Sequence, residues 1–89
     1  MKLKIEFKAS VERDLRKIDQ ATVTGILDRI EEVLGSEDVQ ALALKGEFSG
    51  LYKLRVGDYR VIFVNTDEGF LILRIGHRKD VYRKGRPEV

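Results

Sequence analysis

Three short runs rich in β-branched and aromatic residues follow one another in the second half of the chain, at 51–56, 59–65 and 70–76. The first joint, Gly57-Asp58, has the two-residue length of the primed turns that connect neighbouring antiparallel strands. The second joint runs from Asn65 to Gly69 and places a glycine where a positive φ is expected. The three runs therefore predict an antiparallel meander, which constrains half of the fold.

The N-terminal half begins with alternation and then changes period. Charged residues separate the apolar residues of the first segment, as in a strand with one buried face: Leu3, Ile5 and Phe7. Beyond it, a spacing of four and three places the next apolar residues on one helical stripe: Val11, Leu15 and Ile18. Ser10 is available as the N-cap of this helix.

A second helical stripe follows the interruption at Asp19-Gln20-Ala21 and stops at Gly35, a residue favoured just beyond helix ends. Its apolar members are Val23, Ile26, Leu27, Ile30, Val33 and Leu34. Two helices with so short a link should form an antiparallel hairpin. Residues 36–49 are predicted to form a loop whose middle, Leu42 and Leu44, lies against the core. The order β-α-α-β-β-β indicates an α+β fold with the helices packed on one face of the sheet.

Composition limits the class of protein. The 89 residues, 43% of them apolar, suit a single domain spanning 1–89. Without cysteine there is no disulfide and no thiolate metal site, and the single histidine, His77, argues against a metal centre, so we expect no metal and no cofactor. The alternating N-terminus is unlike a signal peptide or a membrane span. These features predict a soluble protein of the reducing cytoplasm.

Charge is distributed unevenly along the chain. Residues 1–47 carry eight Lys/Arg and ten Asp/Glu, whereas residues 48–89 carry nine and five. Alternation within the meander assigns its side chains to two faces. The face under the helices should carry Tyr52, Leu54, Val56, Tyr59, Val61, Phe63, Leu71, Leu73 and Ile75. The opposite face should carry five cations: Lys53, Arg55, Arg60, Arg74 and Arg78.

The predicted basic face has no acidic residue on its strands, because the nearby acids lie in turns: Asp58, Asp67 and Glu68. Like charges on neighbouring strands repel by on the order of 0.2–1 kcal/mol per opposed pair, so the arrangement favours a polyanionic ligand. The alternative is a solvated face whose basic side chains discourage aggregation. The same face should expose an apolar strip that a protein partner would cover: Ile62, Val64, Phe70 and Ile72.

The segment GHRKDVYRKG at 76–85 adds candidate chemistry. It brings Tyr82 within about one helical turn of Arg78. Tyr82 could act on a substrate, or could pack its ring on the sheet edge as a structural residue. His77 falls on the helix-facing parity, which favours a buried or supporting imidazole over a catalytic one. Lys45 could contact an anion or be a plain loop residue.

Three strings in this order resemble the RelE/ParE superfamily of bacterial and archaeal toxin–antitoxin toxins: LKG at 44–46, LYKLRVGDYRVIF at 51–63 and IGHRKDVYR at 75–83. The resemblance runs from Lys4 to about Gly85 and implies the same fold. Its RelE branch cleaves messenger RNA in the ribosomal A site and is inhibited by a cognate antitoxin, which implies a ribosome, mRNA and an antitoxin protein as partners. The functional positions of that branch fall on Lys53, Arg55, Arg60, Arg78 and Tyr82. RNA contacts are expected at Lys45, Arg74, Lys79 and Arg83.

The implied reaction needs no metal, because the 2′-OH of RNA attacks the adjacent phosphate. Arg60 and Arg78 should hold that phosphate and stabilise its developing charge. Crowding by cations should favour a neutral Lys53 as the base, with Tyr82 as the other candidate for proton transfer or for stacking on a nucleobase. Arg55 stands where the family can have lysine, and an arginine is a poor proton carrier but a good phosphate ligand.

Two other functions remain open from the sequence. The ParE branch shares this fold and poisons DNA gyrase by binding, which gives it no physical need for the five functional positions together. A non-enzymatic module is the second alternative, in which the basic groove binds an acidic antitoxin segment or bulk RNA.

Overall fold

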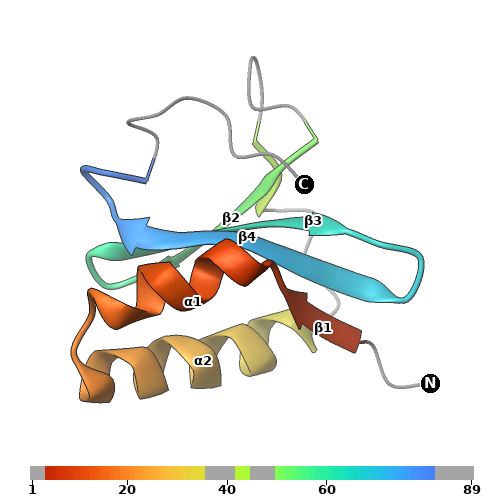
Figure 1. Ribbon diagram of the computed structural model, residues 1–89. Helices are drawn as coiled ribbons and strands as arrows, with labels where there is room; N and C mark the ends of the chain where they lie inside the picture. The colour runs from red at the N-terminus through yellow and green to blue at the C-terminus, as the bar shows by residue number, and fades with distance from the viewer. Residues whose placement is uncertain (1–3, 36–41, 45–49, 82–89) are drawn as a thin grey trace.

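The computed structural model describes residues 4–35, 42–44 and 50–81. Its elements are β1 (Lys4–Phe7), α1 (Ala9–Arg16), α2 (Gln20–Leu34), β2 (Tyr52–Val56), β3 (Tyr59–Asn65) and β4 (Gly69–His77). Both helices lie on the same side of the sheet, which confirms the predicted α+β fold (Figure 1). None of the helices in the described ranges is both long and apolar enough to span a membrane.

The strand order is β1-β4-β3-β2, so the first strand of the chain pairs with the fourth. This pairing is parallel and runs from Lys4 beside Gly69 to Phe7 beside Ile72. Gly69 permits the close approach, because a Cβ at this position would lie 2.1 Å from the Lys4 carbonyl oxygen. Phe7 was predicted on a buried face but is 45% exposed, since β1 is an edge strand of only four residues.

The meander is confirmed by the antiparallel pairing of β2 with β3 and of β3 with β4. At the first joint Val56 pairs with Tyr59 across Gly57 and Asp58. Gly57 has φ 59° and Asp58 has a negative φ, the combination of a primed turn with glycine in its first central position. Tyr52–Val56 is therefore joined to its neighbour by the short turn that the sequence predicts.

The two helices begin and end differently from the prediction in detail. Ser10 lies inside α1, which starts after Lys8 without a side-chain cap, so the predicted N-cap of this helix is wrong. The second helix, α2, does have a side-chain cap: the Asp19 carboxylate accepts a hydrogen bond from the Thr22 backbone N–H at 3.1 Å. Helix α2 does end at Gly35, which has φ −84° and thus a right-handed conformation.

The main core lies between the helices and the sheet. From the helices it receives Val11, Ile26, Ile30 and Leu34, and from the strands Leu54, Val61, Phe63, Phe70, Ile72 and Ile75. Phe63 is central to this core, stacked on Tyr52 at 5.3 Å and edge-to-face with Phe70 at 5.6 Å between ring centroids. Leu42 packs against the same core, as predicted for the middle of the 36–49 loop.

A β-bulge in β4 overturns part of the predicted face assignment. Ile62 pairs with Arg74 while the next residue, Phe63, pairs with Ile72, so Leu73 is an extra residue on β4. The alternation after the bulge is the predicted one, with Ile75 in the main core. Before the bulge it is reversed, so Phe70 and Ile72 face the helices and Leu71 and Leu73 face away.

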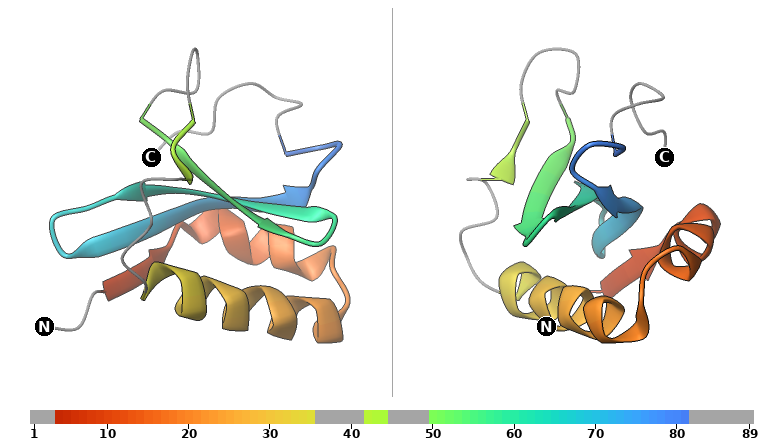
Figure 2. Two further views of the ribbon diagram at one scale, coloured as in Figure 1. Left: turned by 180° about the vertical axis from the view of Figure 1, so that it is seen from behind. Right: turned by 90° about the vertical axis from the view of Figure 1, so that its left-hand side faces the viewer.

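A second apolar cluster covers the sheet face away from the helices. Its members are Leu51, Ile62, Leu73 and Val81, with Leu44, Val64 and Leu71 packed against them. Segments 42–44, 50–51 and 78–81 lie over this face, opposite the helices (Figure 2). The predicted exposed apolar strip is therefore wrong, because Ile62 and Ile72 are fully buried and Phe70 is 6% exposed.

Candidate nucleic-acid interface

Arg60 is the buried member of the predicted basic face, at 8% exposure. It lies on β3 directly opposite Arg55 of β2, so the two side chains share the face away from the helices. One guanidinium nitrogen, Nη1, donates to the carbonyl oxygens of Gly57 and Tyr59, each at 2.9 Å. Among the described residues no carboxylate pairs with Arg60. The β2–β3 turn thus holds a positive charge in place without neutralising it.

Arg78 joins this pair from the end of β4. Its backbone N–H donates to the Asp58 carbonyl oxygen at 2.8 Å, which continues the β3–β4 ladder to the turn. Gly76 pairs with Arg60, and alternation places Arg78 on the same face two residues later. Register therefore gathers Arg55, Arg60 and Arg78 at one end of one sheet face. We call these three residues the arginine cluster.

One acidic residue, Asp58, pairs with a member of the arginine cluster, which the sequence did not predict. Asp58 Oδ1 lies 4.0 Å from Arg78 Nε, and both side chains are mostly exposed. A pair this long and this exposed contributes little attraction, about 0–1 kcal/mol. The expectation of cations without any internal counter-ion is therefore wrong for Arg78, while Arg55 and Arg60 have no acidic partner within the described part of the chain.

Lys53 lies next to the arginine cluster on the same face. It precedes Arg55 by two residues on β2 and pairs with Ile62 of β3. The residue is half-buried and forms no ion pair with the residues that the structure describes. Register thus brings four of the five predicted catalytic residues to neighbouring positions, while Tyr82 lies outside the described residues.

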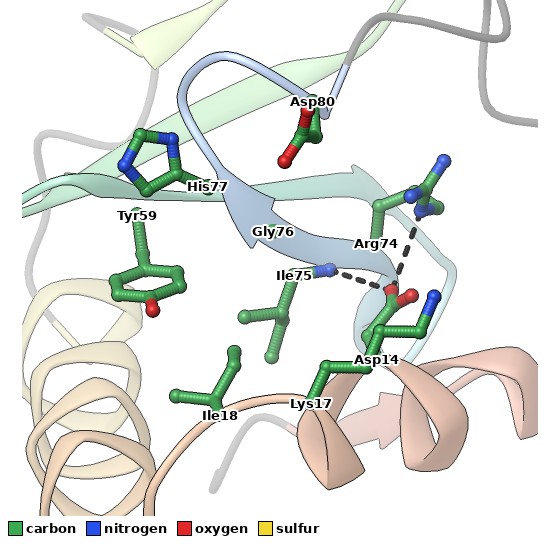
Figure 3. Close-up of a pocket in the computed structure, with 9 residues that line it drawn as sticks. All are labelled: Asp14, Lys17, Ile18, Tyr59, Arg74, Ile75, Gly76, His77 and Asp80. Atoms are coloured by element: carbon green, nitrogen blue, oxygen red, sulfur yellow. Dashed lines mark hydrogen bonds and ion pairs between the residues drawn. The ribbon is translucent and has the colours of Figure 1, made fainter.

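Arg74 does not belong to the arginine cluster. Its Nε lies 3.3 Å from Asp14 Oδ2 on α1, and the same oxygen accepts from the Ile75 backbone N–H at 3.0 Å (Figure 3). Asp14 is a counter-ion that we did not predict, although its spacing from Val11 by three places it on the buried stripe of α1. The charge of Arg74 is thereby compensated at the edge of the sheet.

The remaining predicted residues divide between described and undescribed positions. Lys79 is exposed, and its backbone N–H donates to His77 Nδ1 at 3.2 Å. His77 is half-buried on the helix side, with its ring edge-to-face against Tyr59 at 5.8 Å. Lys45 and Arg83 lie outside the described residues. Within the described ranges no three His, Cys, Asp or Glu side chains are grouped as a metal site.

The family model described as "ParE toxin of type II toxin-antitoxin system, parDE" matches residues 5–82. The chain belongs to this toxin family. A relative named Toxin RelG, from Mycobacterium tuberculosis, is 29% identical over 83 residues that cover 90% of this chain and 95% of the relative. The RelE/ParE resemblance of the sequence is thereby confirmed, and the chain is a toxin of the type II toxin–antitoxin class.

Solved structures of this toxin family share the fold. The toxin–antitoxin complex RelBE2 from Mycobacterium tuberculosis matches with a TM-score of 0.73 and 26% identity, over 85% of this chain and 98% of that one. A mutant of the E. coli toxin RelE in the free state matches with a TM-score of 0.71 and 19% identity, over 94% and 98%. At that lower identity the likeness establishes the fold alone.

Proposed function

We propose that this toxin is a metal-independent endoribonuclease that cleaves messenger RNA in the ribosomal A site by attack of the 2′-OH on the adjacent phosphate. The observation that carries the proposal is the arginine cluster, above all Arg60, a buried cation whose described contacts are two backbone carbonyls. Burying a charge is costly unless it is paired, so Arg60 favours an anionic ligand. An RNA phosphate has the charge and the acceptor oxygens that the cluster lacks.

The reaction requires a charge stabiliser before it requires a base. Attack by the 2′-OH places extra negative charge on the non-bridging phosphate oxygens, and fixed donors aimed at that charge are often the largest catalytic contribution. The two bonds of Nη1 orient the Arg60 guanidinium and leave its Nη2 and Nε groups without a partner among the described residues. Arg78 supplies a second donor group from the neighbouring strand. Arg60 and Arg78 are therefore proposed to hold the scissile phosphate.

The bond from the 2′-oxygen to phosphorus forms while the bond from phosphorus to the 5′-oxygen breaks. Lys53 is assigned to remove the proton of the 2′-OH, with Tyr82 as the other candidate, and the leaving 5′-oxygen takes up a proton. Arg55 is unsuited to this role because a guanidinium remains protonated, so it is proposed as a phosphate ligand. Lys53 lies one alternation from Arg55 on the same face, next to the position proposed for the phosphate. A site without a histidine pair should be a weak nuclease on free RNA, and the ribosome would supply the substrate orientation that the site lacks. Lys45, Arg74, Lys79 and Arg83 are proposed as further RNA contacts.

An antitoxin protein is the proposed regulator, and the cytoplasm, where ribosomes work, is the proposed location. The Mycobacterium tuberculosis RelBE2 structure is a toxin–antitoxin complex. An antitoxin segment that placed acidic side chains near Arg55 and Arg60 would block RNA simply by occupying the site. The exposed Arg55 makes this contact accessible from the surface.

The decisive experiment is an in vitro translation reaction in which mRNA ends are mapped in programmed ribosomes. The purified toxin should produce cuts at the A-site codon without added divalent metal beyond what the ribosome needs. Arg60→Ala and Arg78→Ala should each reduce cleavage by about 100-fold or more, the loss expected for one donor to a developing charge. Arg29→Ala, which removes an exposed arginine from α2, should cleave like the wild type. Intact mRNA with the wild-type protein would refute the proposal.

Gyrase poisoning is the second candidate, because the matching family model is that of ParE toxins. It would require contact with DNA gyrase and no chemistry on RNA. In a supercoiling assay with purified gyrase, the proposed ribonuclease should have no effect at concentrations that stop translation. A non-enzymatic module is separated from the ribonuclease by Tyr82→Phe, which should leave the toxicity of such a module unchanged but should alter the toxicity of a ribonuclease that uses the tyrosine.

A further inference from the structure

A cavity of about 490 Å³ opens at the outer edge of β4, on the helix side of the sheet, whereas the Arg60 side chain lies on the opposite face. It lies where β1 has stopped pairing, since the parallel ladder ends at Ile72 and the cavity begins at Arg74. The end of α1 and the loop after it form its other wall, with Asp14, Lys17 and Ile18. No residue of the arginine cluster lines this cavity.

The side chains of the cavity are separated by kind (Figure 3). The rings of Tyr59 and His77 form one end, with centroids 5.8 Å apart. Arg74 and Lys17 stand at the opposite end beside Asp14, which leaves one net positive charge at that end. A second carboxylate, Asp80, also lines the cavity, so the charges of the lining as a whole balance. A ligand that fits both ends has a flat ring at one side and a single negative charge at the other.

The backbone of β4 contributes hydrogen-bonding groups between these two ends. The Ile75 N–H points away from β3, because it donates to Asp14. Arg78 donates to Asp58 at the β3 side, so the N–H of the preceding residue, His77, points the other way. An antiparallel residue directs its C=O to the same side as its N–H, which places the Ile75 C=O toward the cavity edge. One acceptor and one donor thus face outward side by side, and they can pair with a neighbouring donor and acceptor on the edge of a nucleobase.

We propose that this cavity binds one ribonucleotide, with the base against Tyr59 and His77 and the 5′-phosphate at Lys17 and Arg74. The ring pair supplies stacking, the Ile75 C=O and His77 N–H supply contacts to the base edge, and the charged end accepts a phosphate. Neighbouring strands lie about 4.8 Å apart, so the backbones of Arg60 and of the β4 residues at the cavity are one strand spacing apart. The arginine cluster lies on the opposite sheet face, so an RNA chain that fills both sites has to pass around the outer edge of β4.

The ligand can come from two sources, a free nucleotide or one nucleotide of an RNA chain. Assigning it to RNA rests on the proposed function and makes Tyr59 and Lys17 specificity-determining residues. Binding of a free nucleotide does not depend on ribonuclease activity. The two sources therefore need separate measurements.

The first measurement is an NMR titration of the full chain with adenosine 5′-monophosphate, adenosine and inorganic phosphate. The amides of Ile75, Gly76 and His77 should shift with the monophosphate. Adenosine and phosphate, each lacking half of the contacts, should bind roughly 5- to 100-fold more weakly. No shift with the monophosphate, or equal binding of phosphate alone, would overturn the proposal.

Variants locate the binding. Tyr59→Phe keeps the ring and should bind as the wild type does, whereas Tyr59→Leu should lose roughly 5- to 100-fold in affinity. Lys17 is exposed, so Lys17→Ala should weaken binding without disturbing the fold. Arg29→Ala removes an equivalent helix charge outside the cavity and is the matched control. If Lys17→Ala and Arg29→Ala behave alike and Tyr59→Leu still binds, the cavity is not the site.

The second measurement maps mRNA cleavage in ribosomes. Lys17→Ala and Tyr59→Leu should alter which base is preferred beside the cut, whereas Arg60→Ala should reduce cleavage next to every base. An unchanged base preference would overturn the assignment to RNA. Cleavage that persists in Arg60→Ala would contradict the proposed function and leave nucleotide binding intact. Perturbation of the cavity amides by an antitoxin peptide, without any response to nucleotide, would identify a protein contact and overturn the proposal.

Discussion

The carboxylate of Asp14 on α1 accepts a hydrogen bond from the backbone of Ile75 on β4, where no neighbouring strand among the described residues is present to accept it. Its Oδ2 accepts the Ile75 backbone N–H at 3.0 Å, beyond the last residue that pairs with β1. Exposed strand edges pair readily with other chains, so a helix that satisfies one of these groups protects the sheet. The same oxygen lies 3.3 Å from Arg74 Nε, which ties the edge to a cation.

Asp14→Ala should destabilise the fold, because it leaves a partly buried N–H and a guanidinium without their acceptor. The expected loss is about 1–3 kcal/mol in the free energy of unfolding. Asp14→Asn retains an oxygen acceptor and should cost less. Urea denaturation followed by circular dichroism measures both, and equal stability of the wild type and Asp14→Ala would contradict this role.

Gly69→Ala should separate β1 from the sheet. An added Cβ would lie 2.1 Å from the carbonyl oxygen and 2.7 Å from the nitrogen of Lys4, so the backbone of one strand has to move. Forced overpacking of this kind typically costs about 1–3 kcal/mol. Gly25→Ala is the matched control, since Gly25 is an exposed residue of α2 and a Cβ there meets nothing within 4 Å. It should stabilise the helix by about 0.5–1 kcal/mol, and thermal melts of the two variants should therefore shift in opposite directions.

The cap of α2 gives the fold an acid-sensitive contact. The side-chain hydrogen bond from Thr22, followed by its backbone N–H, holds the pKa of Asp19 below its ordinary value of 3.8. A lowered pKa in the folded state means that the contribution to stability is complete above about pH 4 and is lost as the pH falls through the lowered value. Asp19→Ala should be less stable than the wild type at pH 7, and this difference should shrink at pH 2. Urea midpoints at the two pH values test this, and a constant difference would argue against the cap.

Asp58 should oppose RNA binding, because it is the acid that pairs with the arginine cluster among the residues that the structure describes. Asp58→Asn removes the 4.0 Å contact with Arg78 and should tighten RNA binding by roughly 1.5- to 5-fold, the range of an exposed ion pair. Asp67→Asn removes the same charge from the other turn of the meander and is the matched control. Fluorescence anisotropy with a short RNA at two salt concentrations compares them. Equal affinities of the two variants would assign the effect to net charge alone.

Much of the fold follows from periodicity, because each helix and strand of the hairpin and meander buries one face. The face assignment holds for β2 and β3, where the alternation from Tyr52 to Phe63 is uninterrupted. It fails in β4, where Leu73 is inserted without a glycine or proline to mark the bulge. The residue before the bulge, Ile72, is as apolar as the one inside it, so both faces suit them equally.

The candidate site was predictable to the extent that it depends on register between adjacent strands. Arg55 and Arg60 follow from the two-residue turn, which fixes their pairing. The partner of β1 was not predictable, since Lys4 and Gly69 are far apart in sequence and local patterns carry no information on such contacts. The packing of Val81 in the second apolar cluster was not predictable for the same reason, because Val81 also packs with residues distant in sequence, such as Leu51.

The central place of β4 has a consequence for how toxicity arises. This strand is the neighbour of both β1 and β3, and the residue that follows it, Arg78, is anchored to the Asp58 backbone. A growing polypeptide that ends before residue 78 therefore lacks Arg78, one of the two arginines proposed to hold the phosphate, and has no complete β4 to join β1 to β3. Such a chain cannot hold an RNA phosphate in the proposed way, so the ribosome that synthesises the toxin is not exposed to the proposed activity until Arg78 has been added.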